Sequence, residues 1–367
     1  MRTRALSIFA VIAAITLAGC AGGGAGTPFN NPSSPGSGSQ MTAQEAAQTG
    51  ASAALSEIEN HNLDSSLFSG SVGTVLSSSR MPMSIGSKTT GTCNNGVIKT
   101  VTVVSPTETI YDVQSFYDAG CTQLRRDSSS DVQQPNASTE NIVRTIKNYN
   151  AAGLLMSTRT TNYSVTGAPG NFSAVVTSAL LIGTSSTPEE QGGHQLTVAP
   201  QSANVSTIAG NGARIENVAV PSINESFGSD SVLQNVTATT DVSGDVTFAG
   251  TRNRTFFKGA LGSLSIPASP PFSVSGGTNL GTGTLTGSVQ FDANDQLLSV
   301  ALNGTFVNGN TVVVTSSGSG SSISISGVIS SPSGTQLATF SVDRFGNGLI
   351  TYANGAQAVI LDWHVVK

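Results

Sequence analysis

Residues 285–329 read LTGSVQFDANDQLLSVALNGTFVNGNTVVVTSSGSGSSISISGVI, and this stretch decides the fold class. Apolar side chains recur at every second position in three successive runs, and mostly Thr, Ser and Gln occupy the alternate positions. Because successive side chains on a strand point to opposite faces, the pattern predicts strands with one buried and one solvated face. The residues expected on the buried faces are Leu285, Val289, Phe291, Leu298, Val300, Leu302, Ile323, Ile325 and Ile329.

Turn residues separate these runs and those that follow. Asn-Gly and Asn-Asp pairs favour tight turns between antiparallel strands, and they occur at Asn294-Asp295, Asn303-Gly304, Asn308-Gly309, Asn347-Gly348 and Asn354-Gly355. β-Branched runs at 97–104, 154–165 and 172–182 predict further strands, without the helical insertions that a parallel nucleotide-binding fold requires. The sequence therefore predicts a mainly β protein, a large antiparallel meander arranged as a curved sheet or a β-sandwich.

One helix is expected before the strands. Thr42 and Glu45 have the spacing of a capping box, in which each side chain satisfies a backbone N–H at the start of a helix. From Ala43 to Glu59, alanines together with Leu55 and Ile58 recur at steps of three and four residues, which places a narrow apolar stripe on one face. We expect this short N-terminal amphipathic helix to pack flat on the sheet or to cover its edge.

These patterns divide the chain into four parts. The parts are a signal segment (1–19), a flexible tether rich in Gly, Pro and Ser (20–41), the helix (42–61) and the β-rich domain (62–367). About 300 residues of strand is long for one sandwich, so two subdomains are an open alternative. Their boundary would fall in the Pro-rich stretch Ile266–Gly277 or, as a second choice, in Pro221–Asp230.

The first twenty residues have the layout of a secretory signal. Arg2 and Arg4 precede an uncharged apolar stretch that is too short to cross a membrane as a helix and that ends in Leu17-Ala18-Gly19-Cys20. This ending resembles the lipobox of bacterial lipoproteins, in which the cysteine is acylated and becomes the new N-terminus. The alternative is an ordinary secretory signal with a chance cysteine at its cleavage site.

The resemblance implies an anchor and a location. A diacylglyceryl group and usually a third acyl chain, such as palmitate, on Cys20 would hold the chain stably on a bacterial membrane, because two or more chains suffice where one does not. The domain would then lie in the periplasm or at the cell surface. Ala21, in place of an aspartate, favours the outer membrane if the source is Gram-negative.

Two further cysteines, Cys93 and Cys121, follow the signal segment. An even pair in an oxidising compartment predicts a disulfide. A redox-active or metal-binding pair is the alternative, but it lacks both a C-x-x-C spacing and a neighbouring histidine.

The composition limits the range of partners. Charged residues make up 10% of the chain, and 16 basic residues against 21 acidic ones give a formal net charge of −5. A phosphate-binding surface needs clustered basic side chains, and Arg125-Arg126 is the only adjacent basic pair of the exported part. The sequence therefore predicts no nucleic-acid partner.

Signatures of catalysis and of cofactor binding are missing. The chain has no G-x-S-x-G and no H-E-x-x-H motif, and His61, His194 and His364 are scattered singly. Asp292–Asp295 and Asp343–Gly348 faintly resemble calcium loops, but ordinary turn chemistry explains both. We therefore predict no catalytic residue, no cofactor and no metal site.

The most enzyme-like place is the expected terminal strand Val359–Val366, VILDWHVV. Asp362 and His364 fall on the same face of such a strand, and an Asp that orients a His is a familiar acid–base arrangement. The opposite face is wholly apolar, which favours a strand that closes on a core. No nucleophile is placed beside the pair.

Three functions follow as expectations. The first is a non-catalytic binding or structural module of the envelope, whose partner is a protein, a glycan or the cell wall. The second is a periplasmic carrier, in which a curved sheet with a helix across its mouth holds a lipid or another apolar ligand. The third is a hydrolase that uses Asp362 and His364, which requires a Ser, a Thr or a carboxylate to converge on them. We favour the first.

Overall fold

The computed structural model describes residues 41–68, 85–220, 223–262, 264, 272–293, 295–306 and 308–366. Within these residues it contains one α-helix, α1 (Ala43–Ser65), and one short 3₁₀ turn, η1 (Gly320–Ser322). Strands form most of the remainder, which confirms the mainly β prediction. The strands are β1 (Lys88–Thr90), β2 (Val97–Ser105), β3 (Glu108–Phe116), β4 (Leu124–Asn136), β5 (Thr139–Tyr149), β6 (Leu155–Ala168), β7 (Asn171–Ile182), β8 (Glu190–Ser202), β9 (Val205–Val220), β10 (Ile223–Thr240), β11 (Val246–Leu261), β12 (Gly276–Phe291), β13 (Leu297–Phe306), β14 (Thr311–Ser317), β15 (Ser324–Ser330), β16 (Gln336–Asp343), β17 (Gly348–Tyr352), β18 (Gln357–Leu361) and β19 (His364–Val365).

All of these strands belong to one antiparallel sheet, in which each strand pairs with the next one along the chain. Among the described strands, β1 and β19 are the two ends and do not pair with each other, so the sheet is open. The predicted meander is therefore confirmed, in the form of a single sheet. The Pro-rich stretch 266–277 lies partly outside the described residues, and the strands on either side of it, β11 and β12, pair along their length in this same sheet.

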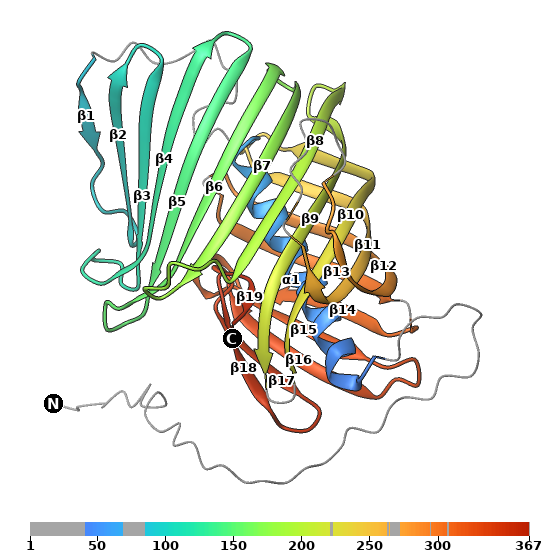
Figure 1. Ribbon diagram of the computed structural model, residues 1–367. Coiled ribbons are helices and arrows are strands. Elements are labelled where there is room, and N and C mark those ends of the chain that lie inside the picture. The colour runs from blue at the N-terminus through green and yellow to red at the C-terminus, as the bar shows by residue number, and fades with distance from the viewer. Residues whose placement is uncertain are drawn as a thin grey trace, which may run out of the picture.

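The sheet curls around α1. Figure 1 shows the helix between strands β6–β10 on one side and the C-terminal strands β11–β17 on the other. Strands β1–β3 extend beyond the helix at the N-terminal end of the sheet, and we call this part the overhang. A disulfide between Cys93 and Cys121 joins the segment before β2 to the β3–β4 connection within this region, with 6.0 Å between the Cα atoms. The predicted disulfide is thus confirmed.

Helix α1 begins as predicted but runs past the predicted end at Glu59. The capping box forms: Glu45 N–H donates to Thr42 Oγ1 over 3.2 Å, and Thr42 N–H donates to Glu45 Oε2 over 2.8 Å. Nineteen of the 23 helical residues are buried, so the helix is enclosed and does not merely cover an edge. The helix approaches the sheet closely at Gly50, where an added Cβ would lie 3.2 Å from Ile329 Cγ2.

Two details of the predicted strands are wrong. A register shift between Gln290 and Phe291 places Leu297 in the core, where it is 2% exposed, and leaves Leu298 half-buried. Asn303 and Gly304 lie inside β13 and not in a turn, because the strand continues to Phe306 before it reverses. The predicted hairpins at Asn347-Gly348 and Asn354-Gly355 are confirmed, between β16 and β17 and between β17 and β18.

Candidate functional site

The predicted strand Val359–Val366 is not continuous, and this separates Asp362 from His364. β18 ends at Leu361 and β19 begins at His364, and these two residues pair across a tight turn. Asp362 and Trp363 form the turn with φ angles of 50° and 69°, as a two-residue hairpin turn requires. The prediction that Asp362 and His364 share a strand face is therefore wrong. Both are buried in the interior, where each meets a different set of charged side chains.

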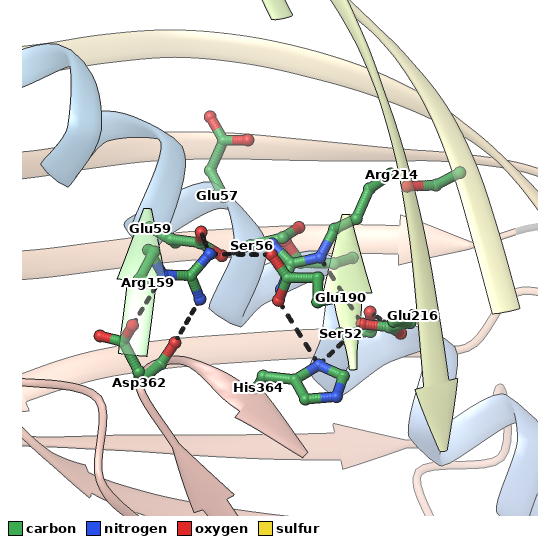
Figure 2. A network of polar contacts seen from close by, with 12 residues as sticks. Ser52, Ser56, Glu57, Glu59, Arg159, Glu190, Arg214, Glu216, Asp362 and His364 are labelled. Atoms are coloured by element: carbon green, nitrogen blue, oxygen red, sulfur yellow. Dashed lines mark hydrogen bonds and ion pairs between the residues drawn. The ribbon is translucent and has the colours of Figure 1, made fainter. Parts of the chain in front are cut away.

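Helix α1 brings two carboxylates into the interior. Glu57 and Glu59 are 4% and 2% exposed, and Figure 2 shows that their side chains point in different directions from the helix. Arginines on inward-facing positions of β6, β9 and β11 meet them. Side chains an even number of residues apart on a strand point to the same face. Arg159 is four residues from the core residue Tyr163, and Arg252 is four residues from the core residue Phe248, so both arginines point into the core.

Arg159 is the centre of the network drawn in Figure 2. Its guanidinium contacts three carboxylates, those of Glu59, of Glu190 at 2.9 Å and of Asp362 at 2.7 Å. Arg214 on β9 contacts Glu59 and Glu190 as well, so the two arginines and these two glutamates form a closed square of ion pairs. The square joins the helix to β6, β8 and β9.

A second set of ion pairs lies beside the first. Glu57 contacts Arg252, Arg254 at 3.4 Å and His61 at 2.8 Å. The His61 ring stacks on Phe248, with 4.7 Å between the ring centroids and 13° between the planes. This set joins the helix to β11.

His364 lies between two glutamates. Its Nδ1 is 3.4 Å from Glu216 Oε2 and 3.5 Å from Glu190 Oε2, and its side chain is fully buried. Ser52 of α1 donates a hydrogen bond to the other oxygen of Glu216. Carboxylates and a serine therefore do converge near His364, but Asp362 is turned toward Arg159.

The pKa values of the glutamates in this network shift in opposite directions. Burial opposes the ionisation of Glu190, but Arg159 and Arg214 outweigh it and lower its pKa. Burial likewise opposes the ionisation of Glu216, but the hydrogen bond with His364 and the charge of Arg214 lower its pKa. Glu59 differs, because burial raises its pKa despite the two arginines, and Glu190 and Asp362 add to the rise. A region with more carboxylates than arginines thus favours a proton on Glu59.

The chemistry that this network offers is structural. A hydrolytic site needs a nucleophile in contact with its base and a place for the substrate beside both. Here Ser52 donates to Glu216 and not to His364, and the Arg159, Glu190 and His364 side chains are at most 1% exposed. These charged side chains form ion pairs with one another. The network therefore ties the helix to the sheet.

A second polar site lies between the concave face of β2–β5 and the loops that follow β12 and β16. Its cavity volume is about 40 Å³. Four cationic side chains line it, and Asp295 is the one carboxylate among the described lining residues. We call this site the arginine hollow, after its residues Arg126, Arg144 and Arg344, which Lys99 accompanies.

The remaining predicted residues are dispersed. Cys20, the signal segment and nearly all of the tether lie outside the described residues. His194 is paired with Asp64 of α1, with 2.6 Å between Nε2 and Oδ1, away from His364. In the described ranges no group of three or more His, Cys, Asp or Glu side chains has the arrangement of a metal site.

Comparisons with known proteins give no relative. No family model matches the chain, and neither the curated proteins nor the solved structures include a match. Among the described residues, no helix has the length and apolar character that crossing a membrane requires.

Proposed function

We propose that the chain is a lipid-anchored envelope lipoprotein whose β domain is a non-catalytic binding module. The observation that carries the non-catalytic part is the closed interior: among the described residues, the buried side chains around Asp362 and His364 contact one another, and the two cavities lined by Glu190, Arg214 and Glu216 have volumes of only about 10 Å³ each. The lipobox-like ending at Cys20 supports the anchor. The arginine hollow supports a binding role, because it combines open space with buried charge.

Two other functions have less support. A carrier of an apolar ligand would need the concave face of the sheet as its cavity, and α1 with its apolar neighbours fills much of that face. A hydrolase that uses Asp362 and His364 would need these residues to act on one bound substrate, and the turn between β18 and β19 directs them to different partners.

The anchor is tested by cell fractionation and mass spectrometry of the full chain and of Cys20→Ser. We expect the parent chain in the membrane fraction, with a diacylglyceryl and acyl mass on Cys20. The Cys20→Ser chain should lack this mass and should keep its signal segment. A parent chain that is released into the soluble fraction with an unmodified cysteine would overturn the anchor.

The non-catalytic role is tested with His364→Gln and Asp362→Asn. A hydrolase would lose turnover of chromogenic esters, phosphate esters or glycosides in both variants. A binding module shows no turnover in the parent chain above that of the heat-unfolded chain. Parent turnover that His364→Gln abolishes, in a variant that remains folded, would replace this proposal with the hydrolase.

A further inference from the structure

We propose that the arginine hollow is a binding site for a small oxyanion group, a carboxylate or a phosphate. This inference rests on the proposed binding module and names its ligand class. Three arguments carry it: the charge of the hollow, the partners that its arginines lack, and its size.

The charge is unusual for this chain. The chain has a formal net charge of −5, yet the described lining residues of the hollow include four cations and one carboxylate. That carboxylate, Asp295, already accepts a hydrogen bond from Ser65 at 3.1 Å and lies 3.9 Å from Arg144 Nη2. The buried cations of the hollow, Arg126 and Arg144, thus carry two positive charges against the one negative charge of Asp295.

The arginines lack partners that such burial normally requires. Arg126 is 8% exposed, and no carboxylate of the described residues lies within ion-pair distance of it. Its described contact is with the ring of Phe345, whose centroid is 5.2 Å from the guanidinium carbon. Arg344 is half-buried and stacks on the same ring at 4.7 Å, and its Nε atom is buried without a hydrogen-bond partner among the described residues. Buried charges without partners are costly, which an anion would correct.

Arg144 converges on the same place. It lies on β5 four residues before Asn148, which is opposite Arg126 in the register of β4 and β5. Its Nε points toward Ser128, 3.3 Å from Oγ, and thus along β4 toward Arg126. Its Nη1 is buried and has no hydrogen-bond partner among the described residues. Burial lowers the pKa of Arg126 to about 10, and the positive charge of Arg144 adds to this effect.

The size of the hollow limits the ligand. A cavity volume of about 40 Å³ holds roughly three water molecules. This is room for a carboxylate or a phosphate group, and not for a lipid chain. Guanidinium groups suit both, because their paired N–H donors match two oxygens of one oxyanion. The hydroxyls of Ser128 and Ser130, which also line the hollow, offer further donors.

The test is a titration of the full chain, purified in detergent, with inorganic phosphate and separately with acetate. Sodium chloride of the same ionic strength is the control for screening. Binding is followed by calorimetry and by the rise in thermal midpoint, with the fluorescence of Trp363 as the signal. Trp363 is the only tryptophan of the chain and packs against Gly346, next to Phe345 of the hollow. A ligand that binds only the folded state raises the midpoint.

We expect saturable binding of at least one of the two anions. Arg126→Met and Arg344→Gln should each weaken it about tenfold, because each removes charge-assisted hydrogen bonds. Lys147→Met, which removes an exposed cation from β5, should leave the affinity unchanged. Without anion, Arg126→Met should unfold no earlier than the parent chain, because it removes a buried charge that has no partner.

The outcomes distinguish a phosphate ligand from a carboxylate ligand. They also distinguish failure of the oxyanion site from failure of the proposed lipid-anchored, non-catalytic module. Phosphate binding alone indicates a phosphate ligand, and acetate binding alone a carboxylate. The inference is overturned if neither anion acts beyond chloride, or if Arg126→Met and Arg344→Gln bind as the parent does. Such a failure removes the oxyanion site only, because the anchoring of Cys20 and the lack of turnover are measured independently.

Discussion

Arg159, in β6, holds both the side chain and the backbone of Asp362, in the turn between β18 and β19. Its Nε donates to Asp362 Oδ2 over 2.7 Å, and its Nη2 donates to the Asp362 carbonyl over 2.9 Å. The two residues are 203 positions apart in the sequence. This contact fixes the C-terminal hairpin against the concave face of the strands near the middle of the chain, and so contributes to the curl of the sheet.

Removal of Arg159 should therefore destabilise the whole domain. Arg159→Met leaves the carboxylates of Glu59, Glu190 and Asp362 with too little positive charge, and breaking a buried ion pair on one side costs about 3–5 kcal/mol. Urea unfolding measures the loss, with Lys147→Met as the control at an exposed site. Equal stability of the two variants would show that the network does not tie the hairpin to β6.

The network should also make the domain sensitive to acid. Glu57, Glu190 and Glu216 have pKa values below the ordinary 4.5, so the unfolded chain binds more protons than the folded one as pH falls below that value. Their stabilisation is complete above about pH 4.5 and is lost as pH falls through the folded pKa values. Glu59, whose pKa burial raises, acts in the opposite direction and offsets a part of this loss.

We expect the urea midpoint to decrease when the pH is lowered from neutral to about pH 3. Glu57→Gln should reduce this decrease, whereas Glu225→Gln, at an exposed position, should not. A midpoint that stays constant or increases on acidification would contradict the lowered pKa values.

Loss of the disulfide should lower the local stability of the overhang, strands β1–β3. The bond closes a loop with a sequence separation of 28 residues, and a loop of this length stabilises the folded state by about 3.5 kcal/mol in the chain-entropy model. The double variant Cys93→Ser/Cys121→Ser should therefore lose hydrogen-exchange protection first in β2 and β3. Dithiothreitol is the control, because it should reproduce this loss in the parent chain and add nothing in the double variant.

Because α1 lies close to the sheet at Gly50, we expect a larger side chain at this position to lower the stability of the domain. Gly50→Leu should destabilise the domain by about 1–3 kcal/mol, because it overpacks the contact with Ile329 and Phe306. Gly50→Ala should change stability less, since the gain in helix propensity offsets the tight contact at 3.2 Å. Thermal unfolding distinguishes the two, and equal midpoints for Leu and Ala would contradict the tight packing.

The strands and the start of the helix were accessible from the sequence because their signals are local. Alternation of Val300, Leu302 and their neighbours indicates β13, and the capping box at Thr42 marks the first turn of α1. The turn at Asp362-Trp363 was not, because the pair lies inside a largely apolar run and a tryptophan seldom takes a positive φ. Packing of Trp363 on Gly346, which no local pattern contains, accompanies that conformation.

The interior charges were missed for a similar reason. Charged residues such as Glu57 and Glu59 in a helix are normally solvated, and their partners on β6, β9 and β11 lie far away in the sequence. One signal was present: Arg252 and Arg254 share the strand parity of Phe248 and Phe256, which places them on the buried face. An arginine on a core face implies an internal carboxylate or a bound anion.

The position of α1 at the start of the described chain affects the order of folding. The neighbouring strands pair locally and can form as the polypeptide lengthens, whereas the helix needs ion pairs with Arg159, Arg214 and Arg252 and contacts with β19. The first of the described elements along the chain is thus among the last of them to reach its final surroundings. Until β11 is synthesised, Glu57 lacks its arginine partners, and until β12–β16 follow, the helix lacks most of the strands that cover it, so a chain truncated before them would leave both exposed to chaperones.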